Sequence, residues 1–161
     1  MLGLGNVLLG DDAVGPLVVQ ALAEAPGAGT MQLRDGGTIG LALLPEIEAA
    51  TAFIAVDAAQ LDAAPGTVQV FEGEAMDRQL GGRKRSAHEV ALFDLMATAA
   101  LCGHLPARRA LVAVQPGSTE LSLHPTPAVA AALPDLMVRV RALVARWQAE
   151  DVALSATQES P

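Results

Sequence analysis

The chain has 161 residues, 52% of them hydrophobic, which is enough for one domain with its own core and excludes an intrinsically disordered protein. The formal net charge of −8 argues against nucleic acid or an anionic membrane as the main partner, because phosphate binding needs clustered positive charge. The single cysteine, Cys102, excludes an intramolecular disulfide and fits a reducing compartment, and its place at an apolar helix end predicts a buried thiol.

The first half of the chain reads as alternating strands and helices. Residues 1–4 predict the stub of a strand, helical spacing follows over residues 16–24, and a short strand is expected over residues 30–34. A helix is expected over residues 41–49. The continuous apolar run of residues 52–57, which ends in a carboxylate, is typical of a central parallel strand.

The second half continues the alternation, with a strand over residues 67–71, a helix over residues 87–102 and a strand over residues 110–114. Helical spacing returns over residues 126–148, where Pro134 is expected to split the helix because proline cannot donate a backbone hydrogen bond there. Residues 1–149 are interpreted as one domain and residues 150–161 as a loose, disordered tail.

Alternating strands and helices predict an α/β fold, a single-domain three-layer α/β/α sandwich with a mostly parallel twisted sheet. Ligands of such sheets bind beyond the carboxyl ends of the strands, so polar residues at strand ends are the candidate functional residues. No apolar run reaches the ~18 residues of a membrane-spanning helix, and no secretory signal is visible. We therefore expect a cytoplasmic protein with no membrane partner.

The first polar cluster is Asp11 and Asp12, which follow a glycine-rich turn after the first strand. A dinucleotide fingerprint would need glycine where Leu8 stands, and adjacent carboxylates repel phosphate, so a phosphate cradle is disfavoured. Two interpretations remain open: one aspartate caps the following helix, or one is a functional carboxylate.

Two further clusters follow along the chain. Asp57 ends the apolar strand, and Asp35 precedes a glycine pair after the strand before it; each fits either a turn or a functional site. Ser86 and Glu89 have the spacing of a capping box, which places His88 in the first turn of a helix. The positive end of the helix dipole there favours the neutral imidazole that metal binding requires. A lone histidine at this position also fits a purely structural role, so both interpretations of His88 stay open.

If Asp12, Asp57 and His88 converge at one edge of the sheet, two carboxylates and an imidazole would suit nickel, zinc or a similar ion. Three protein ligands also leave coordination positions open, as a catalytic site needs. The other two histidines, His104 and His124, stand in loops flanked by glycine and proline and are interpreted as surface residues.

These motifs, taken together, make the chain resemble the hydrogenase maturation endopeptidases over nearly its whole length. Five blocks occur in the order and at the intervals of that family, and a sixth precedes the final helix. They are Gly3-Leu-Gly-Asn-Val-Leu-Leu-Gly-Asp-Asp-Ala-Val-Gly15, Asp35-Gly-Gly-Thr-Ile-Gly40, Phe53-Ile-Ala-Val-Asp-Ala58, Ser86-Ala-His-Glu89, Leu111-Val-Ala-Val-Gln-Pro116 and Leu123-His-Pro-Thr-Pro127.

The resemblance implies an endopeptidase that cuts the C-terminal extension from the large-subunit precursor of a nickel–iron hydrogenase. It implies that Asp12, Asp57 and His88 contact a metal and that Asp35 is tied to activity as a candidate catalytic residue. The nickel is supplied by the substrate and used for recognition, and no organic cofactor is implied. The oligomeric state is left open, with a monomer among the options.

Two alternatives belong to other classes. A nickel-site chaperone or escort for the large subunit would use the same three residues without cutting. A peptidyl-tRNA hydrolase-like enzyme shares the Gly3-Leu-Gly-Asn6 opening but needs a histidine soon after it, and this chain has none before His88. Residues 72–85 are expected to be substrate-specific loops, and their cluster of Arg83, Lys84 and Arg85 fits a solvated loop or a docking patch.

One feature departs from the family. Its members usually carry several apolar residues before the Gly-x-Gly-Asn block, and these form the central first strand. Here only Met1 and Leu2 precede Gly3, so the first strand is expected to be truncated, as it would be if the start site were assigned too late.

Overall fold

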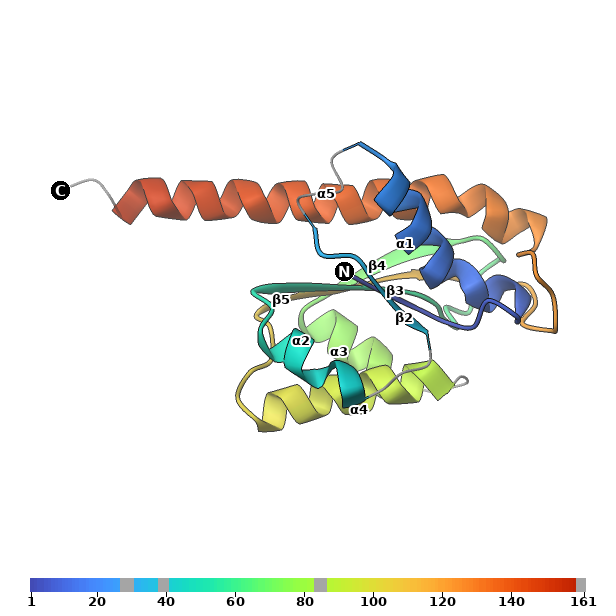
Figure 1. Cartoon of the computed structure of the whole chain (residues 1–161), viewed down its shortest axis with the longest axis horizontal. Helices are drawn as coiled ribbons and strands as arrows, with labels where there is room; N and C mark the ends of the chain where they lie inside the picture. The colour runs from blue at the N-terminus through green and yellow to red at the C-terminus, as the bar shows by residue number, and fades with distance from the viewer. Residues whose placement is uncertain (27–30, 38–40, 83–86, 159–161) are drawn as a thin grey trace.

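The computed structural model describes residues 1–26, 31–37, 41–82 and 87–158, which form one sheet covered by helices on both faces (Figure 1). The five strands lie in the order β2-β1-β3-β5-β4. They are β1 (Leu2–Leu4), β2 (Arg34–Gly37), β3 (Ala52–Ala58), β4 (Val68–Glu72) and β5 (Arg108–Val114). Every pair is parallel except β4 and β5, so the expected mostly parallel α/β sandwich is confirmed.

The antiparallel edge strand follows from the length of its connections. A parallel crossover needs a dozen or more residues and usually a helix. Residues 59–67, between β3 and β4, contain no helix and are too few for such a crossover. The chain therefore turns back, and β4 runs antiparallel to β5 at the edge of the sheet.

The two outer layers bury alternate side chains of the same strands. Helices α1 (Val14–Glu24) and α5 (Pro127–Gln158) cover one face, and α2 (Leu44–Glu48), α3 (Glu74–Gly81) and α4 (Ala87–Leu101) cover the other (Figure 1). In β3, Ile54 and Val56 pack under α1 and α5, whereas Phe53 and Ala55 pack against the opposite layer. A strand buried on both faces reads as an uninterrupted apolar run, and this is why β3 was predicted correctly.

Helix α1 lies close to β1 and β3 because Gly15 of the helix faces Gly3 of β1. A Cβ atom on Gly15 would lie 2.2 Å from the carbonyl oxygen of Leu4 and 2.7 Å from that of Val56, and a Cβ on Gly3 would lie 2.3 Å from the carbonyl oxygen of Gly15. No other residue fits these positions. The close approach fixes the turn before α1 against the carboxyl ends of β1 and β3.

Several predicted boundaries were wrong. Strand β2 begins at Arg34 rather than ending there, so Asp35 and the glycine pair lie within the strand. The helix expected over residues 41–49 is a short 3-10 helix η3 (Leu41–Leu43) followed by α2. The expected loop over residues 72–85 contains α3, while Arg83, Lys84 and Arg85 lie outside the described residues.

Pro134 does not split the last helix, which runs from Pro127 to Gln158. The lost hydrogen bond is offset by packing, because Val129, Leu136 and Val140 are fully buried on either side of the proline. Residues 150–158, expected as part of a loose tail, continue α5, and residues 150–155 of this helix are exposed. Arg108 anchors this end by donating to the carbonyl oxygen of Trp147 at 3.1 Å and to Asp151 at 2.5 Å.

The first strand is short, as expected, and pairs only through Leu2 and Gly3 with β3. The described helices include none that is both long and apolar enough to cross a lipid bilayer.

Candidate functional site at the carboxyl ends of the strands

The candidate residues gather at the edge of the sheet where β1, β2 and β3 end. Asp12 lies in η1 (Gly10–Ala13), the 3-10 turn between β1 and α1, and Asp57 lies at the end of β3. Asp35 lies in β2 beside β1, in register with Gly3. Helix α4 begins at this same edge, because it leads back to the start of β5, which runs parallel to β3 (Figure 1).

Asp12 is held by the turn that follows β1. Its side chain is 5% exposed, and its Oδ2 accepts a hydrogen bond of 2.9 Å from the backbone N–H of Asn6. Gly5 permits this geometry, because its φ is +129° and a Cβ there would lie 1.7 Å from the carbonyl oxygen of Asp12. The turn therefore packs closely against Asp12 and orients its carboxylate through the N–H of Asn6.

Asp57 is even less accessible, with 1% of its surface exposed. It pairs in register with Ala113 of β5, and Val56 before it pairs with Gly3 of β1. Asp57 near the end of β3 and Asp12 in the turn after the neighbouring strand β1 are thus two buried carboxylates. Burying carboxylates is costly, and proteins tolerate it where cations or hydrogen bonds compensate. The placement therefore fits the oxygen half of a metal site.

Asp35 differs from the other two aspartates because it is exposed. Its Oδ1 accepts a hydrogen bond of 2.9 Å from the backbone N–H of Gly37, and the carbonyl of Gly37 in turn accepts one of 3.2 Å from Gly5. These contacts join the end of β2 to the turn that holds Asp12. Asp35 is thus an exposed carboxylate next to the turn that carries the buried Asp12.

His88 is the second residue of α4, so its backbone stands in the first turn of a helix, as predicted. Its side chain lies outside the described part of the structure, and so does Ser86, the first residue of the predicted capping box. Among the side chains that are described, no three His, Cys, Asp or Glu residues are grouped to hold a metal ion. The trio of Asp12, Asp57 and His88 therefore stays a prediction.

Asp11 carries a role that the sequence did not reveal. Neither η1 nor α1 has a side-chain cap, so the capping interpretation was wrong. Instead, the fully buried Asp11 carboxylate accepts hydrogen bonds from a loop more than 100 residues away. The donors are the backbone N–H groups of Gly117, Ser118 and Thr126, at 2.7, 3.0 and 2.5 Å, and the Thr126 hydroxyl, at 2.9 Å.

The charge of Asp11 depends on these donors. Burial disfavours the ionised carboxylate, but the hydrogen bonds from Ser118, Thr126 and Gly117 outweigh it and hold the pKa of Asp11 below its ordinary value. The sequence held one local signal for this role. Asp11 and Asp12 are adjacent, and a site that needs one carboxylate from this turn leaves the other aspartate for a different purpose.

The remaining candidates are surface residues. His104 and His124 are exposed, as interpreted from the sequence, and His104 lies 3.8 Å from Glu48. Cys102 is also exposed, so the predicted buried thiol was wrong. It lies just after the last residue of α4, where the chain turns away from the core.

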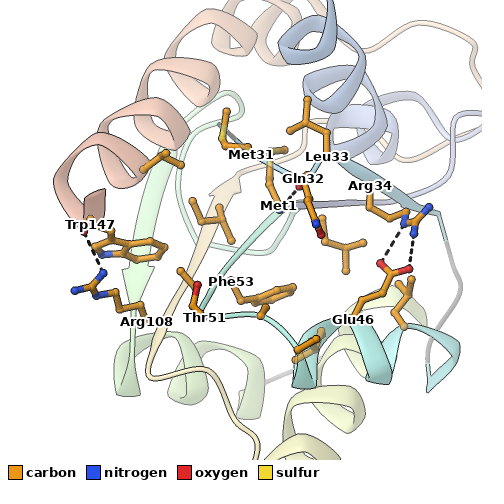
Figure 2. Close-up of a pocket in the computed structure, with 18 of the residues that line it drawn as sticks. Met1, Met31, Gln32, Leu33, Arg34, Glu46, Thr51, Phe53, Arg108 and Trp147 are labelled. Carbon is orange, nitrogen blue, oxygen red and sulfur yellow. Dashed lines mark hydrogen bonds and ion pairs between the residues drawn. The ribbon is translucent and has the colours of Figure 1, made fainter. Parts of the chain in front are cut away.

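A cavity of about 790 Å³ lies at the opposite ends of the strands (Figure 2). Met1, Phe53 and Trp147 line it, together with the Arg34–Glu46 ion pair. None of Asp12, Asp35 or Asp57 is among its lining residues. The candidate site is therefore separate from this cavity and lies at the other end of the strands.

Comparisons with known proteins agree with this arrangement. The profile of the hydrogenase maturation protease family matches residues 16–142. Hydrogenase expression/formation protein HupD of Rhodobacter capsulatus is 38% identical over 121 residues, which cover 74% of this chain and 58% of HupD. Several relatives of this kind are longer proteins, of which the chain spans little more than half.

A shorter relative matches almost end to end. Hydrogenase 2 maturation protease of Escherichia coli is 33% identical over 146 residues, covering 88% of this chain and 87% of that protein. The solved structure of the hydrogenase maturating endopeptidase HybD from E. coli superposes with a TM-score of 0.83 at 32% identity and covers 90% of both chains. HybD from Thermococcus kodakarensis gives a TM-score of 0.75 at 25% identity, covering 89% of this chain and 96% of that one.

Proposed function

This chain belongs to the hydrogenase maturation protease family, and on that premise we propose that it removes the C-terminal extension from the large-subunit precursor of a nickel–iron hydrogenase. The nickel already bound in the precursor is part of the substrate and serves for its recognition. We further infer that the reaction takes place in the cytoplasm, where a lone exposed thiol such as Cys102 stays reduced.

One observation carries the proposal. Asp57 near the end of β3 and Asp12 in the turn after β1 are buried carboxylates, on the edge where α4 begins with His88 in its first turn. Two carboxylate oxygens and one imidazole nitrogen match the preference of nickel for mixed oxygen and nitrogen ligands. Asp35 is exposed at the same edge, and we propose that the precursor approaches the site from this side of the sheet.

The different exposure of the three aspartates suggests a different role for each. Asp12 and Asp57 are fixed in place and suit positioning of the metal end of the substrate, with His88 as the third contact. A substrate-bound metal polarises the scissile carbonyl or lowers the pKa of a water. Asp35, which is exposed on the neighbouring strand, is proposed as the general base that accepts the proton of the attacking water.

Replacing His88 by alanine tests the proposal. With purified nickel-loaded precursor, the His88→Ala variant should process at least about 100-fold more slowly, because it loses one of three metal contacts. Asp12→Asn and Asp57→Asn should behave alike, and the urea midpoint of the His88 variant should match wild type. His104→Ala, which changes an exposed histidine just after the other end of α4, is the control and should cut normally.

Mass spectrometry of the precursor separates cutting from binding. Loss of the tail mass in the presence of wild type, and its absence with His88→Ala, supports the protease. Full processing by His88→Ala rejects the proposed roles. Stable binding of the nickel-loaded precursor by wild type without any change in its mass would instead favour an escort protein.

A further inference from the structure

Exposed apolar side chains concentrate beside the candidate site. Within the described residues, nine large hydrophobic side chains are exposed, and four of them come from two short turns. Val7 and Leu8 are 51% and 49% exposed, and Leu121 and Leu123 are 83% and 73% exposed. Scattered single leucines on a surface are ordinary, but a group of four at one place marks a contact surface.

Backbone hydrogen bonds hold the two turns side by side. The N–H of Ser122 donates to the carbonyl of Leu8, and the N–H of Gly10 donates to the carbonyl of Ser122, both at 2.9 Å. Leu9 and Ser122 form a parallel bridge. Leu8 on one turn and Leu121 and Leu123 on the other therefore lie next to the residues that join the two turns. We call these leucines, with Val7, the apolar rim surface.

The apolar rim surface is rigidly joined to the candidate site. Asn6 begins the first turn: its N–H donates to Asp12, and its side-chain oxygen accepts from the N–H of Leu8 at 3.0 Å. The second turn is fixed by the four hydrogen bonds to Asp11, the residue before Asp12. The two loops also lie next to each other beyond the strand ends in Figure 1. A ligand on this surface therefore has a fixed offset from Asp12.

Charge indicates what can occupy this surface. No lysine or arginine occurs in residues 1–33 or 110–138, the two segments that build it. The ionisable groups nearest to it in sequence are Asp11, Asp12, Glu120 and His124. A segment with acidic residues would meet like charge here, whereas an apolar segment with neutral or basic neighbours would not.

We propose that the apolar rim surface docks the precursor's C-terminal extension, through an extended apolar stretch free of acidic residues. This inference rests on the proposed function and adds a specificity surface to it. Docking the tail against Leu8, Leu121 and Leu123 presents the bond to be cut at a set distance from Asp12. The surface should then govern the affinity for the precursor rather than the chemical step.

The test compares two double variants. Leu121→Gln/Leu123→Gln alters the surface, and Leu101→Gln/Leu154→Gln changes two other exposed leucines, in α4 and α5, which are 89% and 60% exposed. Binding of nickel-loaded precursor is measured by biolayer interferometry, and kcat and KM are measured separately. For the first variant, Kd and KM should rise about tenfold with kcat within about twofold of wild type, because hot-spot apolar contacts dominate affinity. The second variant should match wild type.

Variants of the precursor test whether its tail is the segment that contacts the apolar rim surface. Replacing two apolar residues of the precursor tail by aspartate should weaken binding to wild type about tenfold, but add little to the loss in Leu121→Gln/Leu123→Gln. Unchanged Kd in that protein variant would overturn the docking inference even if wild type cuts the precursor. If Leu121→Gln/Leu123→Gln binds the precursor more weakly but wild type does not cut it, the docking inference holds and the protease function is rejected. No binding by wild type rejects both.

Discussion

Asp11 and Asp12, adjacent residues in the turn before α1, have different hydrogen-bond partners and different roles. The carboxylate of Asp12 accepts a hydrogen bond from Asn6, whereas that of Asp11 accepts hydrogen bonds from the loop of residues 117–126. Asp11 thus acts as a buried anchor that fixes the second turn of the apolar rim surface. Its contribution should be visible in stability, apart from any effect on processing.

We predict that Asp11→Asn lowers the free energy of unfolding by about 2–3 kcal/mol. An amide retains one acceptor oxygen but turns an N–H₂ group toward donors such as the backbone of Ser118, so buried hydrogen bonds are lost. Urea unfolding at pH 7 measures this loss. Asp62→Asn, at an exposed position, is the control and should change stability by less than about 0.5 kcal/mol.

The same residue predicts an acid dependence. Burial alone would raise the pKa of Asp11, but its hydrogen bonds keep the folded-state pKa below the ordinary 3.8. A carboxyl group with a depressed folded pKa stabilises the protein above its unfolded pKa, and that stability is lost as the pH falls through the folded value. Wild type should therefore lose more unfolding free energy than Asp11→Asn between pH 6 and about pH 3. Equal losses in urea titrations would contradict this.

At the scale of elements, close contact between a helix and a strand places the site. Gly15 of α1 lies directly over Leu4 of β1, and this contact fixes the turn that carries Asp12. In the final helix, α5, the local sequence disfavours the observed structure, because Pro134 would be expected to interrupt a helix. α5 passes through Pro134 because buried residues on both sides hold it to the sheet.

We predict that Gly15→Ala destabilises the protein by more than about 3 kcal/mol. The added methyl would lie 2.2 Å from the backbone oxygen of Leu4, which cannot move without displacing the central strand. Thermal unfolding by circular dichroism measures the effect. Gly81→Ala serves as the control, because its Cβ would meet only a Phe93 ring atom at 3.8 Å, and its melting temperature should stay near that of wild type.

We predict that Pro134→Ala stabilises the protein by about 1–3 kcal/mol. Alanine restores a backbone donor in the middle of α5 and relieves the clash of the proline ring with the preceding turn. A rise of several degrees in the melting temperature is expected. A lower melting temperature would mean that α5 needs the bend of a proline to follow the sheet.

At the scale of the whole molecule, two cores share one sheet. β3 and β5 send alternate side chains into both, so neither helical layer has a core without the strands. The only tryptophan, Trp147, is buried in the α1 and α5 layer. The opposite layer carries the turn of α4 with His88, so the candidate site depends on both layers being folded.

We therefore predict a single cooperative unfolding transition. Trp147 fluorescence reports one layer and far-ultraviolet circular dichroism reports all helices, and the two midpoints in urea should coincide. The stabilised Pro134→Ala variant should shift both midpoints together. A fluorescence midpoint well below the dichroism midpoint would show that the α5 layer opens independently.

The sequence by itself determined the fold class, the central strand, the helix that begins near His88 and the family resemblance that the comparisons bore out. These are local patterns: a doubly buried strand reads as an apolar run, and a motif keeps its spacing along the chain. Only the tertiary structure decided the role of Asp11, the continuity of α5 through Pro134, the helix in residues 72–85 and the exposure of Cys102. In each case the deciding contact joins segments distant in sequence or depends on which way a turn faces, and local propensity carries no information about either.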